Sequence, residues 1–187
     1  KTAYEIMPSL VGSEMCIRDS ACKVFKLKEG DVFEGEVEFI DVSSSTKSSS
    51  KSAHNNALSH FHAIILHTNK PEETIARYCW LTDQSSPRRI FGSSWQVGLD
   101  QQKIIVCSEE DVERIFPSVD VSNLPSILGY ALLTESLSKT KDCFSHNELV
   151  TQSLNQGSFS VKLPKFLSGN LIIGTSAADF PWNGDFN

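Results

Sequence analysis

The sequence predicts an α+β fold. An N-terminal antiparallel β-sheet, made of a hairpin plus further strands, is followed by a mainly helical part within a single domain. Up to residue 107, apolar residues alternate with polar ones or form short β-branched runs, as is typical of strands. Beyond residue 107, patterns that start helices appear. Strands first and helices afterwards is an arrangement that indicates an α+β fold.

The first expected element is a hairpin within the segment KVFKLKEGDVFEGEVEFIDV. Phe25 and Leu27 alternate with lysines, and beyond the turn EGD, Phe33, Val37 and Phe39 alternate with glutamates. Alternation with period two indicates half-buried strands, and two such runs joined by a glycine turn form a hairpin. Its outer face should place lysines opposite glutamates, which is a favourable cross-strand pairing.

The rest of the sheet is expected in segments rich in β-branched and aromatic residues. Pro71 and the charges beside it are interpreted as a turn between the first two of these segments. The expected strands are HFHAIILH (60–67), TIARYCWL (74–81), RRIFGSSWQVG (88–98) and KIIVC (103–107).

The helical part is expected to begin at Ser108. An aspartate follows this serine by three positions, apolar residues with helical spacing come next, and Pro117 ends the pattern. The longest helix is expected over 123–139, because Asn123 can cap it and its leucines form a wide apolar face. A third helix is expected over 145–155, where Ser145 and Glu148 form a capping box. Two strand-like segments, 158–167 and 170–175, close the chain.

Residues 43–57 are expected to form a flexible, serine-rich loop. The segment contains almost no apolar residues, so it cannot bury enough surface to offset the entropy of ordering. A long insertion of this kind costs little stability, because the entropy of loop closure grows slowly with length.

The first twenty residues, KTAYEIMPSLVGSEMCIRDS, resemble the translation of an indexed, transposase-type sequencing adapter. In a single reading frame, one fixed part of such an adapter gives Lys1 to Glu5, and the other gives Leu10 to Asp19, with an index of the usual length between them. The segment lacks the apolar core of a signal peptide and the arginine-rich composition of a transit peptide. We therefore expect residues 1–20 to be non-native and residues 21–187 to form the globular domain, truncated at either end or both. No family is recognised in residues 21–187.

Composition argues against two kinds of partner. The formal net charge is −6, whereas domains that bind nucleic acid usually carry a basic face. No apolar run approaches the roughly 18 residues that indicate a membrane-spanning helix. Four cysteines outside the adapter-like segment are far apart and are expected to be reduced, which favours a cytoplasmic or nuclear location. They are Cys22, Cys79, Cys107 and Cys143.

His60 and His62 are a candidate pair of metal ligands. Residues two apart in a strand point to the same side, so both imidazoles could meet one metal ion. Glu72 or Glu73 could add a carboxylate. The alternative is that these histidines are polar residues on a solvated strand face, and the lack of a second ligand pair favours that alternative.

A basic and aromatic region between residues 77 and 95 is the candidate partner-binding site. Arginine and tryptophan are favoured where proteins bind partners, and this region stands in an otherwise acidic chain. The alternative is a salt-bridged surface loop. The residues are Arg77, Trp80, Arg88, Arg89 and Trp95.

These observations favour a non-catalytic interaction or regulatory domain of a larger intracellular protein, with an acidic protein as its partner. The alternative is a metal-dependent enzyme with a site at His60 and His62. The sequence contains no G-x-S-x-G, P-loop or G-x-G-x-x-G motif, and it indicates no cofactor. Whether the protein is an enzyme is left open by the sequence.

Overall fold

The computed structural model describes seven stretches of the chain. It divides the chain into two compact units, Lys1–Lys51 and Ser52–Asn187. The described residues are 11–17, 20–27, 30–34, 37–41, 55–116, 126–164 and 169–183.

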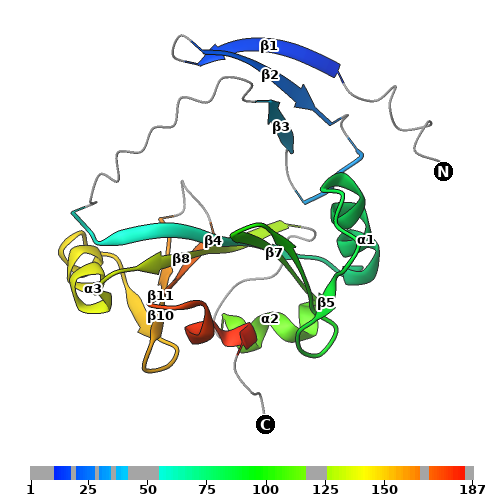
Figure 1. Ribbon diagram of the computed structural model, residues 1–187. Coiled ribbons are helices and arrows are strands. Elements are labelled where there is room, and N and C mark those ends of the chain that lie inside the picture. Colours follow the sequence, from blue (N-terminus) through cyan, green and yellow to red (C-terminus); the bar gives the residue numbers. More distant parts are fainter. Residues whose placement is uncertain are drawn as a thin grey trace. The chain divides into compact units, whose positions relative to one another are not determined.

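The first unit contains a three-stranded antiparallel sheet, shown in blue in Figure 1. Its strands are β1 (Val11–Ile17), β2 (Ser20–Lys26) and β3 (Glu38–Asp41). The pairing of β2 with β3 confirms an antiparallel pair in this segment. The second strand starts at Glu38 and not directly after the turn EGD, and Phe33 lies exposed in a bend. Lys26 lies opposite Glu38, and their side chains form an ion pair with 2.5 Å between Nζ and Oε1. Strand β1 falls within the adapter-like segment and pairs along its whole length with β2.

The second unit is built on an eight-stranded mixed sheet (Figure 1). The strand order is β5-β6-β7-β4-β8-β11-β10-β9. The strands in the first part of this unit are β4 (Leu58–His67), β5 (Arg88–Arg89), β6 (Trp95–Leu99) and β7 (Gln102–Cys107). Those in the second part are β8 (Ser126–Thr134), β9 (Thr151–Ser153), β10 (Ser158–Lys162) and β11 (Asn170–Gly174).

Helices and short turns cover both faces of this sheet. Helix α2 and the C-terminal turns pack on one face, where they enclose the main core, and α3 packs on the other. Helix α1 lies against β6 and β7. The bounds are α1 (Pro71–Leu81), α2 (Glu109–Ile115), α3 (Leu137–His146), η3 (Ala177–Asp179) and η4 (Pro181–Asn183). Among the described residues, no helix has the length and apolar character needed to cross a membrane.

The strands pair in the same sequence of parallel and antiparallel neighbours from each edge of the sheet to its centre. Strands β7 and β11 run parallel to β4 and β8, and β4 and β8 are antiparallel to each other. Strands β6 and β10 are each antiparallel to their inner neighbour, as are the edge strands β5 and β9. Ala63 and Ala131 face each other where β4 meets β8. The unit therefore consists of two similar halves, 58–116 and 126–183, which an approximate two-fold axis near these alanines relates.

Each half ends with the same kind of buttressed turn. Asp111 receives hydrogen bonds of 2.8 Å from the Ser93 amide and from two serine hydroxyls. In the second half, Asp179 accepts from the amides and hydroxyls of two consecutive residues at 2.7–3.1 Å. A Cβ at Gly92 would overlap the Asp111 carboxylate, and a Cβ at Gly157 would overlap that of Asp179. In both halves, glycine is therefore needed where the chain passes the aspartate.

The expectation of an antiparallel sheet followed by a mainly helical part is wrong. The sheet contains parallel pairs, α1, α2 and α3 each lie between strands along the chain, and strands continue to residue 174. Segment 74–81, which was expected as a strand, belongs to α1. Pro71 stands in the first turn of this helix, with Glu72 and Glu73 beside it, and is not a turn between strands.

The second error concerns residues 123–139, which were expected to form the longest helix. Residues 126–134 are instead β8, a central strand with apolar residues on both faces. A continuous apolar run of this kind cannot be distinguished from a buried helix by periodicity alone. The helix starts later, at Leu137, where the Ser136 hydroxyl accepts from the Lys139 amide. The third expected helix, 145–155, is mainly a turn and β9.

Several other expectations are confirmed. Segments 60–67, 88–98 and 103–107 contain β4 to β7, and the two closing segments contain β10 and β11. Helix α2 begins directly after Ser108, as the pattern predicts. Most of the expected serine-rich loop, residues 43–54, lies outside the described residues, and so do 117–125.

Candidate functional site

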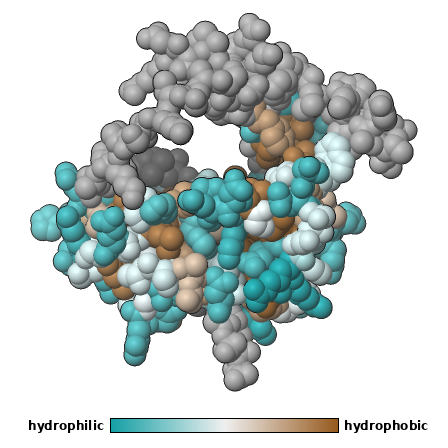
Figure 2. All heavy atoms as spheres, in the orientation of Figure 1, coloured by the Kyte–Doolittle hydropathy of each residue, from teal (hydrophilic) through white to brown (hydrophobic). Residues whose placement is uncertain are grey.

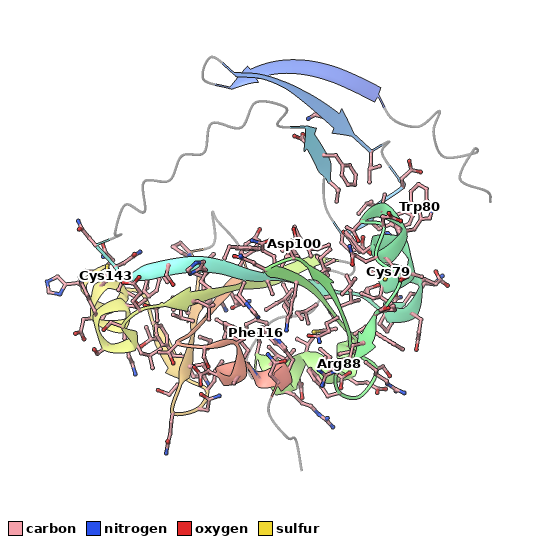
Figure 3. All side chains as sticks on the ribbon, viewed as in Figure 1. Cys79, Trp80, Arg88, Asp100, Phe116 and Cys143 are labelled. Atoms are coloured by element: carbon pink, nitrogen blue, oxygen red, sulfur yellow. The ribbon has the colours of Figure 1, made fainter. Side chains whose placement is uncertain are left out.

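The structure separates the five predicted partner-binding residues into two groups. Arg88 and Arg89 form β5 at the edge of the sheet, and both are exposed. Trp95 lies opposite Arg89 on β6 and is half-buried. On α1, Trp80 is 48% exposed and Arg77 is half-buried. In Figure 3, Trp80 on α1 and Arg88 on β5 lie well apart, so the five residues do not form one patch.

The two predicted metal ligands lie in different environments. His60 is exposed, whereas His62 is only 6% exposed and its ring stacks on Phe180 at a centroid distance of 4.8 Å. Pairing irregularities between Leu58 and His60, and between Phe61 and Ala63, interrupt the regular alternation of β4. Glu72 and Glu73 are exposed on α1. No three His, Cys, Asp or Glu side chains in the described part of the chain are grouped so that they could hold a metal ion.

Four polar side chains gather on the sheet face that α2 covers. Arg88 lies opposite Gln96, and Gln96 lies opposite Ile105, which belongs to the main core beneath α2. Lys103 is two residues before Ile105 on the same strand, so it points to the same face. His62 reaches this face through its stacking on Phe180, another residue of the main core. We call Arg88, Gln96, Lys103 and His62 the basic cluster.

The charges of the basic cluster are not neutralised by carboxylates among the described residues. Burial lowers the pKa of Lys103, and the nearby positive charge of Arg88 lowers it further. Burial also lowers the pKa of His62, and the charge of Lys103 adds to that effect. Neither Arg88 nor Lys103 forms an ion pair within the described residues. In Figure 2, a strongly hydrophilic patch covers the edge of the sheet where β5 lies in Figure 1.

Buried polar atoms without partners lie in and beside the basic cluster. The Nε2 of His62 and the Oε1 of Gln96 are buried and have no hydrogen-bond partner among the described residues. The same is true of the Nε1 of Trp182, whose ring stacks on Phe180 at 5.1 Å. Gly98 lies opposite Lys103, and no atom stands within 4 Å of the place where its Cβ would be. The cluster therefore combines unsatisfied polar atoms with open space.

The other candidates for chemistry are weaker. A hollow of about 300 Å³ lies between the starts of α1 and α2, but it is lined by three glutamates and neutral residues. Cys107 is fully buried, and burial raises the pKa of its thiol to about 12, so it is not a ready nucleophile. Cys79 and Cys143 are free, half-buried thiols.

No known protein family matches the chain, and no curated protein matches it. The sequence pointed to Arg88 and His62 but missed Gln96 and Lys103. A signal for both was present, because residues 95–107 read as a tight hairpin that places positions 98 and 103 opposite each other. The link from this hairpin to His62 depends on the parallel pairing of β4 with β7, which local sequence does not reveal.

Proposed function

We propose that this chain is a non-catalytic interaction domain that binds an acidic partner at the β5 edge of its second unit. The observation that carries the proposal is the exposed Arg88, which stands beside the half-buried Lys103, while neither cation forms an ion pair with a carboxylate in the described part of the chain. A guanidinium pairs bidentately with carboxylate or phosphate, and a desolvated cation gains more from such a partner than a hydrated one. Trp80 and Arg77 on α1 are not needed for this surface.

The metal-dependent alternative has less support. Burial lowers the pKa of His62 and the positive charge of the nearby Lys103 lowers it further; the same charge would oppose a metal cation. Its neighbour His60 is exposed. The polar environment of His62 therefore suits an anion better than a cation.

The proposal is tested by titrating the full chain with a poly-glutamate peptide at low and high salt. Replacing Arg88 and Arg89 by alanine should weaken binding at least ten-fold, while stability changes by no more than about 0.5 kcal/mol, as is usual for surface positions. Binding by the unaltered chain should weaken as salt rises, because exposed charges are screened.

A matched control removes two positive charges elsewhere. The exposed Lys139 and the half-buried Lys141 lie on α3 in the other half, so replacing both by alanine changes the net charge equally. Binding should survive in this control. If both double variants lose the same affinity, the peptide responds only to net charge and the proposed surface is wrong.

A further inference from the structure

We propose that the basic cluster is a binding site for a phosphate-type oxyanion carrying two negative charges, supplied by a phosphorylated side chain of the acidic partner. This inference rests on the proposed function and assigns the chemistry of the group that Arg88 and Lys103 bind. Carboxylates and phosphates both pair with arginine, so the choice between them depends on charge and on the number of donors.

Charge favours phosphate. Arg88 and Lys103 are two cations close enough for one to lower the pKa of the other, and the described residues supply no ion pair to either. A phosphorylated side chain carries a charge of about −1.5 to −2 at neutral pH, which matches two cations, whereas a carboxylate neutralises only one. A bound dianion would replace the repulsion between the two cations with attraction to both.

The donors favour a tetrahedral acceptor. The guanidinium of Arg88 and the ammonium of Lys103 donate without accepting. His62 can donate from Nε2 in the tautomer that carries the proton on that nitrogen. Gln96 can donate from its Nε2 after its side-chain amide is flipped by 180°. The three oxygens of a phosphate monoester can accept from donors on several strands, whereas the two oxygens of a carboxylate lie in one plane.

The sheet leaves room for such a group. Gly98 adds no side chain opposite Lys103, and the space above it is open. Its φ is not positive, so other residues can stand there without backbone strain. A glutamate introduced at position 98 would bring its own carboxylate to the cluster and compete with an external anion.

The test uses inorganic phosphate as the first probe, titrated into the full chain and followed by the amide resonances of β5 to β7. Phosphate should shift these resonances, and Lys103→Asn should weaken its affinity at least ten-fold. Gly98→Glu should abolish the shifts while the rest of the spectrum stays folded. If both variants bind phosphate as tightly as the unaltered chain, the cluster is not the site.

Two peptides distinguish the sources of the phosphate. One is an acidic peptide containing phosphoserine, and the other has glutamate in its place. The phosphoserine peptide should bind at least ten-fold more tightly than both the glutamate peptide and inorganic phosphate, and Lys103→Asn should remove that advantage. Equal binding of phosphoserine peptide and inorganic phosphate would overturn the assignment to a partner's side chain.

The outcomes separate this inference from the function on which it rests. If poly-glutamate binding depends on Arg88 and Arg89 but the phosphoserine peptide has no advantage, the interaction domain stands and the phosphate site falls. If inorganic phosphate binds through Lys103 but neither peptide binds, the cluster is an anion site but the proposed binding of an acidic protein partner is wrong.

Discussion

The two halves of the eight-stranded sheet share a framework but carry different side chains on the face covered by α2. In the first half, Lys103 lies opposite Ala63; at the corresponding place in the second half, the buried Ile172 lies opposite Ala131. The polar side chain on the same strand is Asn170, two residues earlier. Asn170 is buried and satisfied, because its Nδ2 donates to the Leu128 carbonyl at 3.0 Å. Lys103 is half-buried, and its ammonium forms no ion pair with another described residue.

The same contrast holds at the other positions of the basic cluster. Gln96 lies opposite Ile105 in the first half, and Ser158 lies opposite Gly174 at the corresponding place in the second. The residue before the central alanine is His62 in the first half and a tyrosine in the second. The framework can thus be built with neutral side chains at the corresponding positions of the second half. The framework therefore does not require the charges of the first half, and this supports the binding role that we propose for them.

The largest expected effect comes from the aspartates that buttress both halves. Asp111→Ala should destabilise the second unit by about 3 kcal/mol. The substitution removes the charged acceptor of three hydrogen bonds and leaves their buried or half-buried donors without a partner. Asp179→Ala should cost only about 1 kcal/mol, because water can replace the carboxylate at that more exposed turn. Urea unfolding of both variants measures the difference.

The exposed Glu110, next to Asp111, provides the control, and Glu110→Ala should leave stability within about 0.5 kcal/mol. Equal losses of unfolding free energy for Asp111→Ala and Asp179→Ala would show that the two turns stabilise the unit equally. The greater burial of the first turn would then make no difference to stability.

Adding a lysine to the second half and removing the one in the first half tests the comparison directly. Asn170→Lys should destabilise by about 2 kcal/mol, because it loses the bond to Leu128 and buries an unpaired cation. Lys103→Asn should leave stability unchanged or raise it by no more than about 0.5 kcal/mol, because solvent screens much of the cost of this partly exposed charge. Thermal unfolding of both single variants checks the signs. A large loss for Lys103→Asn would mean that the lysine serves the fold.

The pH dependence of stability should also reflect the first half, because His62 and His67 lie on β4. Burial lowers the pKa of both below the ordinary value of 6.5, and Glu109 opposes the shift only at His67. A base with a lowered folded pKa stabilises the protein above its unfolded pKa and loses that contribution as the pH falls. The urea concentration at the midpoint of unfolding should therefore decrease as the pH is lowered from about 7.5 to about 5.5.

His62→Phe should reduce this pH dependence, because phenylalanine can keep the stacking on Phe180 but does not titrate. His60→Phe is the control, since His60 is exposed. A pH profile that is identical in the unaltered chain and in His62→Phe would show that the pKa of His62 is the same in the folded and the unfolded chain, and that burial does not lower it.

The smallest expected effect concerns residues 1–20, which we propose to be adapter-derived. A chain that begins at Ala21 lacks β1 but keeps the pair β2 and β3 and all of the second unit. Its Tm should stay within about 2 °C of the full chain, since roughly 1 kcal/mol corresponds to 2–4 °C at this size. A loss of several degrees in differential scanning calorimetry would show that the segment supports the fold.

The sequence by itself determined the elements whose pattern is local. Alternation around Phe25 and Phe39 predicted the pairing of β2 with β3, β-branched runs predicted β4 and β7, and Ser108 marked the start of α2. It also pointed to Arg88 and His62 as residues of interest. These predictions succeed because period, capping and turn chemistry depend on residues within a few positions of each other.

Only the tertiary structure decided the rest. Residues 126–134 form a strand because β4 and β11 pair with them on both sides and other elements pack on both faces of the sheet. An apolar run in the sequence does not reveal these neighbours. His62 turns to the α2 face at an irregular part of β4, where the alternation that the sequence implies does not hold. Lys103 joins His62 through a parallel pairing that spans α1, β5 and β6 along the chain. Such pairings depend on packing between distant segments, so the basic cluster became visible only once the sheet was assembled.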